Sequence, residues 1–317
     1  MKDDNAIVFA SNGLGDALMT LPTINALCHL FDSVRLITSC NSDGTFEEIY
    51  SQSSCRDIVT IDIRETPEGK DFDVQELHAI IDNFQVFICL NEWVPRDVNS
   101  YNDFISKFKK SIGCYDIYSS KIIRQNNQHT TDYFFEYAKY FDKKITIDHF
   151  RPTFSYSQIA TEKVENFRKK LPSKYRILIF HGDSQPEKMI PRKMLDSIIT
   201  QVLSAHKNLL IIVIGTSYPF HRKFEHERLY IIQNLDFTLT WAFFKVADYF
   251  VGVDSVFLHL ADFYDIPSLG LFGPTNCDEW GFRLNRNHKH IKSKSGDMND
   301  ISSKHFFQKL GEILDSD

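Results

Sequence analysis

The sequence predicts an α/β protein built from two similar halves, each with a parallel sheet and helices on both faces. Three observations support this prediction. Short apolar segments, typical of strands buried on both sides, alternate with segments of helical period. Glycine-containing turns follow several of the apolar segments. The alternation then starts again after Arg151-Pro152, and 317 residues suffice for two domains of about 150 residues each.

The first half begins with an apolar strand at 6–10, which ends at a turn containing Gly13 and Gly15. A helix is expected next, because apolar residues recur at helical spacing at Leu18, Leu21, Ile24, Leu27, Leu30 and Phe31. Further elements are expected as strands at 34–38, 57–63 and 86–90 and as a helix at 131–141. Residues 95–130 show few clear periods, so no element is assigned to them.

Arg151-Pro152 and the polar residues after it form the predicted linker, which gives one domain at 1–152 and another at 153–317. In the second domain, strands are expected at 176–180, 209–214, 229–232, 249–251 and 268–272. Helices are expected at 157–171, from about 192 to 204, and at 238–246, 255–264 and 302–314. Because each half places a glycine-containing turn after a strand, we expect two Rossmann-like domains.

Composition excludes several classes of protein. The net charge of −6 and the lack of long Lys/Arg runs give no support to nucleic-acid binding. Apolar stretches such as 209–214 are far shorter than the roughly 18 residues of a membrane-spanning helix. Two aspartates precede the first apolar run, so no signal peptide is expected. The six cysteines form no CxxC or CxH pair, which favours reduced thiols in a cytoplasmic protein over disulfides or zinc.

Ligands of open α/β sheets bind beyond the carboxyl ends of the strands. This rule selects four loops, at 11–16, 181–191, 252–259 and 273–281. The first loop lacks the third glycine of a dinucleotide fingerprint, where Leu18 stands, and no acidic residue closes the second strand near Ser39. A nicotinamide or flavin site is therefore not expected. Asp16 has two interpretations: an acid in the first turn of a helix, or a carboxylate that accepts a proton in a cleft.

The other loops also allow two interpretations each. Lys188, beside Ser184, either holds a phosphate or is a solvent-exposed lysine. Asp254 and Ser255 stand where a strand meets a helix, where backbone N–H groups bind anions and where Asp254 could simply cap the helix. His259 follows one turn later. The turn at 273–275 either only reverses the chain or lets backbone approach a nucleotide.

Asp71-Phe72-Asp73 has the DxD form with which some enzymes bind Mg²⁺. It lies in a stretch flanked by glycine and lysine, away from a predicted strand end. This position favours an exposed loop, so no metal site is expected there.

Taken together, the four loops resemble glycosyltransferase family 9, the bacterial ADP-heptose:lipopolysaccharide heptosyltransferases. Residues 13–27, GLGDALMTLPTINAL, are similar to the G-x-GD-x5-P opening of the family. Residues 181–193, HGDSQPEKMIPRK, resemble its HPGAS-x-x-KxWP loop. Residues 247–282, ADYFVGVDSVFLHLADFYDIPSLGLFGPTNCDEWGF, resemble its long closing signature. Residues from about 60 to 150 match little.

The resemblance implies the GT-B fold, in which two Rossmann-like domains face each other across a cleft. It implies an acceptor-side domain at 1–152, with Asp16 as the catalytic base in a loop that also contains Asn12, Gly13 and Gly15. It implies a donor domain at 153–317, where Lys188 binds the donor diphosphate and Asp254 binds hydroxyls of the donor sugar. The other implied donor-binding residues are Ser184, Ser255, Val256, His259, Gly273, Pro274 and Thr275.

The implied reaction is transfer of a heptose or related sugar from ADP-heptose, with inversion and without a metal or cofactor. Implied acceptors are a lipopolysaccharide or other surface glycan, a glycolipid, a protein or a small molecule. A lipid-linked acceptor would place this cytoplasmic enzyme at the inner face of the inner membrane, held peripherally.

Four departures indicate a diverged member. Asp183 adds a carboxylate within the HPGAS-like loop, Val256 replaces a glycine, and Ile190 replaces a tryptophan. Asn276-Cys277 stands where the family has a proline. Two alternatives therefore stay open: a degenerate GT-B protein that binds a nucleotide sugar without transfer, and a GT-B nucleotide-sugar epimerase or hydrolase. Nucleotide release without any acceptor would indicate the epimerase or hydrolase.

Overall fold

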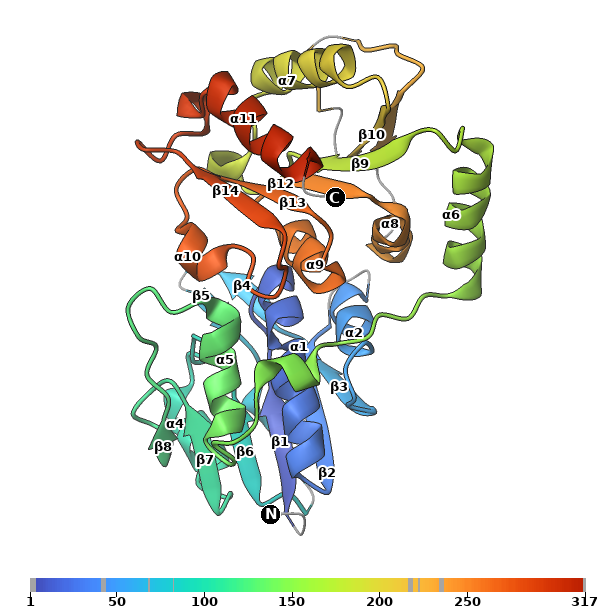
Figure 1. The fold of residues 1–317 in the computed structure, drawn as a ribbon. Helices are drawn as coiled ribbons and strands as arrows, with labels where there is room; N and C mark the ends of the chain where they lie inside the picture. Colours follow the sequence, from blue (N-terminus) through green and yellow to red (C-terminus); the bar gives the residue numbers. More distant parts are fainter. Residues whose placement is uncertain are drawn as a thin grey trace. The chain divides into compact units, whose positions relative to one another are not determined.

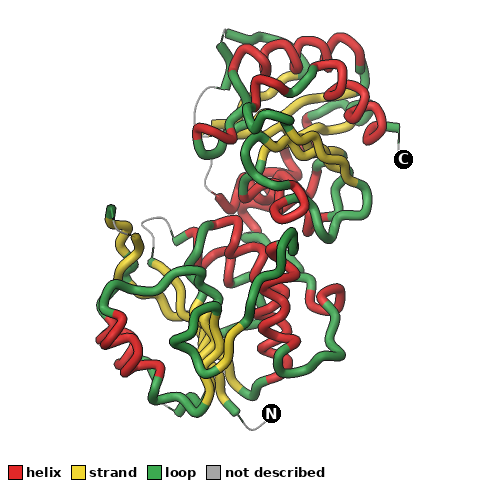
Figure 2. Tube along the Cα trace, turned by 90° about the vertical axis from the view of Figure 1, so that its left-hand side faces the viewer, coloured by secondary structure: helices red, strands yellow, loops and turns green. Residues whose placement is uncertain are grey.

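The computed structural model of the protein describes residues 4–40, 44–67, 69–81, 83–215, 219–221, 223–233 and 237–315. The chain divides into two compact units, Met1–Phe154 and Ser155–Asp317. The predicted boundary follows residue 152, and the division in the structure follows Phe154. Figures 1 and 2 show a parallel sheet and its covering helices in each unit, and each unit is described by itself.

The first unit contains a six-stranded parallel sheet in the order β3-β2-β1-β6-β7-β8. Its strands are β1 (Asn5–Phe9), β2 (Ser33–Ser39), β3 (Asp57–Ile61), β6 (Val86–Cys89), β7 (Lys110–Gly113) and β8 (Ser120–Lys121). A separate antiparallel hairpin consists of β4 (Arg64–Thr66) and β5 (Gly69–Asp71). When this hairpin is left out, the order is 3-2-1-4-5-6, that of a dinucleotide-binding α/β sheet.

Helices cover both faces of this sheet. They are α1 (Leu14–Leu30), α2 (Thr45–Tyr50), α3 (Val74–His78), α4 (Val98–Ile105) and α5 (Thr130–Lys139), followed by the short 3₁₀ helix η1 (Ile147–Phe150). Ile7 and Phe9 of β1 form one apolar cluster with Leu77 of α3 and Phe104 of α4. Successive strand residues point to opposite faces, so Val8, between them, faces the side of the sheet away from α3 and α4.

The second unit repeats the plan, with a parallel sheet in the order β11-β10-β9-β12-β13-β14. Its strands are β9 (Arg176–His181), β10 (Leu209–Gly215), β11 (Leu229–Gln233), β12 (Tyr249–Val253), β13 (Ser268–Phe272) and β14 (His288–Lys292). This is again the 3-2-1-4-5-6 order.

The helices of the second unit are α6 (Gln158–Lys170), α7 (Arg192–Ala205), α8 (Phe237–Phe243), α9 (Val256–Tyr264), α10 (Cys277–Trp280) and α11 (Ser303–Leu314). The described residues of this unit also form the short 3₁₀ helices η2 (Pro186–Lys188), η3 (Phe244–Val246) and η4 (Met298–Asp300). Ile198 of α7 and Leu310 of α11 share one core with Leu178 and Val251 of the sheet. Figure 1 shows α7 and α11 on one face of this sheet and α8 and α9 on the other.

The α/β prediction with two Rossmann-like sheets is therefore confirmed. The unassigned region 95–130 forms α4, β7 and β8, and no residue ranges were predicted for α2, α3, the β4–β5 hairpin, α10 or β14. No helix among the described residues is both long and apolar enough to cross a membrane.

The strand order also positions the site. In such sheets the strand order reverses between the first and fourth strands, and ligands bind in the crevice beyond the carboxyl ends of these two strands. Here these pairs are β1 and β6 in the first unit and β9 and β12 in the second.

Candidate functional site

Lys188 and Asp254 meet at the strand reversal of the second unit. Lys188 ends η2 in the loop after β9, and Asp254 directly follows β12. The Lys188 Nζ lies 2.8 Å from the Asp254 Oδ2, and the two side chains are 21% and 5% exposed. A carboxylate so well buried needs a compensating charge, because removing it from water is costly. The structure thus brings together the two charged residues that the sequence selects in different loops.

Further contacts hold these two loops in place. The Ser184 hydroxyl donates to the Asp254 carbonyl over 2.8 Å, which ties the loop after β9 to the turn after β12. The Ile190 N–H donates to the Gly182 carbonyl over 3.1 Å, and the buried Ile190 side chain packs beside Gly182. Ile190 therefore supports the loop by apolar packing at the position where the family has a tryptophan.

The N-terminus of α9 adjoins this ion pair. Ser255 is the N-cap residue, and its side chain makes no capping hydrogen bond. Asp254 is therefore not the cap of α9. The Ser255 Oγ is buried and has no hydrogen-bond partner in the described part of the chain. The first backbone N–H groups of a helix lack intrahelical partners and carry the positive end of its dipole. Val256, the first residue of α9, keeps such an N–H despite its side chain.

The turn at Gly273, Pro274 and Thr275 follows β13. A Cβ on Gly273 would lie 2.9 Å from the Met298 side chain and 3.0 Å from the Gly296 carbonyl, so packing requires glycine here. The Thr275 Oγ1 is buried without a hydrogen-bond partner among the described residues. The Lys292 Nζ donates to the Gly273 carbonyl, a contact that sequence reasoning missed because it selected no loop after β14.

Two histidines of this unit are buried. His259 lies in α9 and is 3% exposed. The His181 Nδ1 lies 3.1 Å from the Ile214 carbonyl oxygen, and its ring packs against Phe257. Burial lowers the pKa of His181, which favours the neutral ring. His181 is therefore a packed, hydrogen-bonded residue of the sheet.

Asp16 lies at the strand reversal of the first unit. It is the third residue of α1, and its Oδ2 accepts the Gly13 N–H over 2.9 Å. A Cβ on Gly13 would lie 3.2 Å from this oxygen, so glycine leaves room for the carboxylate. The side chain is half-buried. An acid in the first turn of a helix is stabilised by the helix dipole. Asp16 is thus an acid of the first helical turn. Because α1 directly follows β1, the same position places Asp16 at the carboxyl edge of the sheet.

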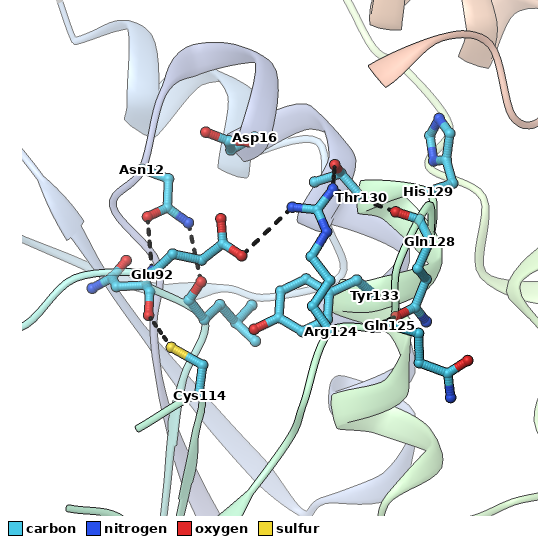
Figure 3. A network of polar contacts seen from close by, with 12 residues as sticks. Asn12, Asp16, Glu92, Cys114, Arg124, Gln125, Gln128, His129, Thr130 and Tyr133 are labelled. Atoms are coloured by element: carbon cyan, nitrogen blue, oxygen red, sulfur yellow. Dashed lines mark hydrogen bonds and ion pairs between the residues drawn. The ribbon is translucent and has the colours of Figure 1, made fainter. Parts of the chain in front are cut away.

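Asn12 joins the loop after β1 to the segment after β6 (Figure 3). Its Nδ2 donates to the Leu90 carbonyl over 3.0 Å, and its Oδ1 accepts the Glu92 N–H over 3.3 Å. On the other side, the Lys70 Nζ of β5 donates to the carbonyls of Ser11 and Asn12 over 3.2 and 3.0 Å. The hairpin that interrupts the Rossmann order therefore brings a cation to the loop that contains Asp16. Gly15, half-buried, lies between Asp16 and this anchored part of the loop.

Glu92 and Arg124 form a second ion pair, with 3.6 Å between the Arg124 Nη1 and the Glu92 Oε1. Sequence reasoning missed both residues and Lys70. A signal for Glu92 existed, because it directly follows the predicted strand at 86–90 and the rule of carboxyl ends applies to it as well. Arg124 and Lys70 gave no such signal, since one follows a two-residue strand and the other lies in a hairpin outside the sheet.

The DxD triplet has structural contacts. Asp73 caps α3 by accepting the Gln75 N–H over 2.9 Å, and the Asp71 Oδ1 accepts the Arg96 N–H over 3.3 Å. The expected exposed loop is thus the end of β5 and the start of α3, and Phe72 between them is buried. Across the described ranges, no three His, Cys, Asp or Glu side chains are grouped to hold a metal ion.

The sequence and the fold were compared with those of known proteins. A family model for glycosyltransferase family 9 (heptosyltransferase) matches residues 121–310. No protein of curated function matches the sequence. Among solved structures, the glycosyl transferase family 9 protein from Veillonella parvula DSM 2008 has a TM-score of 0.73 at 13% identity, covering 100% of this chain and 99% of its own.

Two Escherichia coli structures are similar as well. The ADP-heptose lps heptosyltransferase II has a TM-score of 0.68 at 14% identity, with 98% of each chain covered. Heptosyltransferase WaaC with ADP has a TM-score of 0.63 at 13% identity, with 98% of this chain and 99% of the other covered. Likeness at such low identity establishes the shared fold, which is GT-B. Since the family model spans more than half of the 317 residues, the chain belongs to glycosyltransferase family 9, the heptosyltransferase family, and is a glycosyltransferase.

Proposed function

We propose that this enzyme transfers a heptose, or a related sugar, from an ADP-activated donor to a hydroxyl of a surface-glycan or lipopolysaccharide-type acceptor. The transfer inverts the anomeric carbon and needs no metal. The observation that carries the proposal is the Lys188–Asp254 pair beside the N-terminus of α9, at the strand reversal of the second unit. The donor unit is Ser155–Asp317 and the acceptor unit Met1–Phe154.

The chemistry of the second unit suits a nucleotide diphosphate sugar. Lys188 and the free N–H groups at the start of α9 offer positive charge to the diphosphate. Asp254 offers carboxylate oxygens to the hydroxyls of the donor sugar. In this proposal the ammonium of Lys188 moves partly from Asp254 to the diphosphate when the donor binds. The buried hydroxyls of Ser255 and Thr275 are further donors without a protein partner in the described ranges. His259 and the Gly273-Pro274 turn complete the site.

These groups also account for catalysis without a metal. As the bond between the anomeric carbon and the diphosphate breaks, negative charge builds on the leaving group. Lys188 and α9 stabilise that charge, and one oriented donor of this kind contributes on the order of 3 kcal/mol, or about a hundredfold in rate. The ADP and ADP-heptose named with the heptosyltransferase structures support this donor class.

Asp16 acts as the general base in this proposal. Its carboxylate takes the proton of the acceptor hydroxyl while the hydroxyl oxygen attacks the anomeric carbon from the face opposite the diphosphate. One displacement of this kind inverts the configuration. A positioned base contributes about 10²–10⁴-fold to the rate. Where the acceptor is lipid-linked, the enzyme works as a peripheral protein at the inner face of the membrane.

Calorimetric titration tests the donor site. ADP-heptose, ADP, and UDP- and GDP-sugars are titrated into the wild type, Lys188→Ala and the control Lys207→Ala, which removes an exposed lysine of the same unit. We expect selective binding of ADP-heptose, weakened on the order of a hundredfold by Lys188→Ala and unchanged by Lys207→Ala.

Preference for another nucleotide sugar would overturn the heptose assignment and keep the transferase. Tight donor binding without turnover on any acceptor extract would favour a degenerate binding protein instead.

A further inference from the structure

The segment after β6, residues 90–93, is held in place by side chains from several other parts of the first unit. Asn12 binds its backbone at Leu90 and Glu92. The Tyr115 hydroxyl donates to the Glu92 carbonyl over 2.7 Å. These contacts come from different parts of the first unit, and they fix the direction in which the Glu92 side chain leaves the backbone.

Neighbouring residues add to this anchoring. The Asn91 Oδ1 accepts the Ser11 N–H over 2.6 Å, and the Cys114 Sγ donates to the Asn91 carbonyl over 3.4 Å. The Trp93 Nε1 donates to the Ser11 carbonyl over 3.1 Å. Asn91 is almost fully buried, yet its Nδ2 has no hydrogen-bond partner among the described residues. A buried donor left unpaired is costly, so the Asn91 Nδ2 can take a partner from outside the described residues, such as water or a ligand.

Arg124 forms an ion pair with the Glu92 carboxylate itself. Its Nη1 faces the Glu92 Oε1, while its Nη2 donates to the Thr130 Oγ1 and the Gln128 carbonyl over 2.7 and 3.3 Å. The guanidinium also lies over the Tyr133 ring, 5.5 Å from its centroid (Figure 3). The positive charge of Arg124 is thus compensated by groups of the protein itself.

The second carboxylate oxygen of Glu92, Oε2, is available for a further interaction. The side chain is 39% exposed, and no described residue donates a hydrogen bond to its Oε2. Glu92 is also linked to Asp16 through the loop after β1, because Asn12 holds the Glu92 N–H and the next residue, Gly13, donates to Asp16. The Glu92 carboxylate is paired with a cation, is partly exposed, and is joined to the proposed base through Asn12 and Gly13. It is therefore suited to accept a hydrogen bond from a hydroxyl.

We propose that Glu92, positioned by Arg124, binds a second hydroxyl of the acceptor sugar, and that this subsite selects a neutral, hydroxyl-bearing ring over one carrying a carboxylate or phosphate at that position. An anionic group there would face the Glu92 carboxylate, while Arg124 is paired with Glu92 and the Lys70 ammonium is bound to the carbonyls of Ser11 and Asn12. The proposal rests on the proposed function, because it takes Asp16 as the base and the first unit as the acceptor unit.

Binding of matched glycosides to the protein saturated with ADP tests this subsite. The first pair is methyl glucoside and methyl glucuronide, and the second is methyl mannoside and its 6-phosphate. Their dissociation constants are measured by saturation-transfer NMR for the wild type, Glu92→Gln and Glu136→Gln. Glu136 is a matched control, because it is also 39% exposed and also pairs with a cation, Lys139, in the same unit.

We expect each neutral glycoside to bind at least about 10-fold more tightly than its anionic counterpart. Glu92→Gln should weaken binding of the neutral glycosides by about 10-fold and reduce the ratio between the dissociation constants of the anionic and neutral glycosides. Glu136→Gln should leave the affinity and this ratio unchanged. In turnover with the accepted glycoside, Glu92→Gln should raise the acceptor KM more than it lowers kcat.

Three results would overturn the subsite: wild type that prefers the anionic glycosides, wild type that binds no neutral glycoside, or equal effects of Glu92→Gln and Glu136→Gln. Failure of the proposed function is distinguished by calorimetry, because it would appear as a lack of ADP-heptose binding by the wild type. Unchanged ADP binding by Glu92→Gln shows that this variant is folded.

Discussion

Single carboxylates in this enzyme are placed by two different physical means. The Asp254 side chain, 5% exposed, is compensated by the ammonium of Lys188 at 2.8 Å. Asp16 has instead the Gly13 N–H and the start of α1. The first arrangement suits a group that exchanges its cation for a ligand. The second suits a group that must stay ionised until a proton arrives.

A third carboxylate, Asp262, has a structural role and a testable pH dependence. Its Oδ1 accepts the N–H groups of Arg283, Leu284 and Asn285 over 2.9, 2.8 and 2.7 Å. Burial raises the pKa of Asp262 to about 6. Between about pH 4 and pH 6 the folded protein therefore binds more protons than the unfolded chain, and its stability falls as the pH rises through this window. Two pKa units correspond to roughly 3 kcal/mol.

The variant Asp262→Asn isolates this effect. It keeps an Oδ1 that can accept all three N–H groups and removes the charge, so the fall in stability between pH 4 and pH 6 should become smaller. Urea unfolding at several pH values measures it. Asp265→Asn is the matched control, because Asp265 is exposed and its Oδ1 accepts the N–H of Arg286 in the same segment. Identical pH profiles of Asp262→Asn and the wild type would contradict the assignment.

Residue roles are the part of the site that sequence could predict only in part. The sequence selected Lys188 and Asp254 in separate loops, but their ion pair forms only because the fold brings these two loops together. Glu92 and Arg124 are 32 positions apart in sequence and pair only through the fold. Contacts of this kind leave no local pattern.

Secondary-structure elements were likewise predicted only where the sequence carries a local pattern. Strands buried between two others, such as β1, β9 and β12, are short apolar runs and were predicted from them. The edge strands β8 (Ser120–Lys121) and β14 (His288–Lys292) are short or polar, because one side of an edge strand has no neighbouring strand. The helix α4 was missed since it has eight residues in a stretch of polar composition.

One buried side chain, Arg228, binds the end of α7 and the start of β10. Arg228, 5% exposed, donates to the carbonyls of Leu203, His206 and Leu209 over 2.5, 2.7 and 2.9 Å. The last carbonyls of a helix have no intrahelical donor, so a buried guanidinium replaces the water that would otherwise bind them.

Arg228→Met should therefore destabilise the second unit by about 3 kcal/mol, because three carbonyls lose the buried guanidinium as a donor. Arg228→Lys should recover only part of this loss, since an ammonium does not span three carbonyls as the planar guanidinium does. The midpoint of urea unfolding gives the measurement, with Lys207→Met as the control. Equal midpoints for Arg228→Met and Lys207→Met would show that the cap is dispensable.

At the scale of the whole molecule, the chain uses one plan twice. Both units have the 3-2-1-4-5-6 strand order, and in each the charged residues gather where the order reverses. The rule of carboxyl ends therefore located Asp16, Lys188 and Asp254 from sequence alone, and it missed Glu92 and Arg124. It did not select Lys70, because the β4–β5 hairpin that brings this lysine to Ser11 and Asn12 lies outside the repeated plan.

The central claim is that one unit supplies the base and the other binds the donor. It is tested most directly by measuring donor affinity and sugar transfer together for Asp16→Ala, with Asp103→Ala, an exposed aspartate of the same unit, as the control. The account predicts that Asp16→Ala binds ADP-heptose nearly as tightly as the wild type while transfer falls by about 10²–10⁴-fold. Full transfer by Asp16→Ala, or a loss of donor affinity that accounts for the whole loss of transfer, would contradict it.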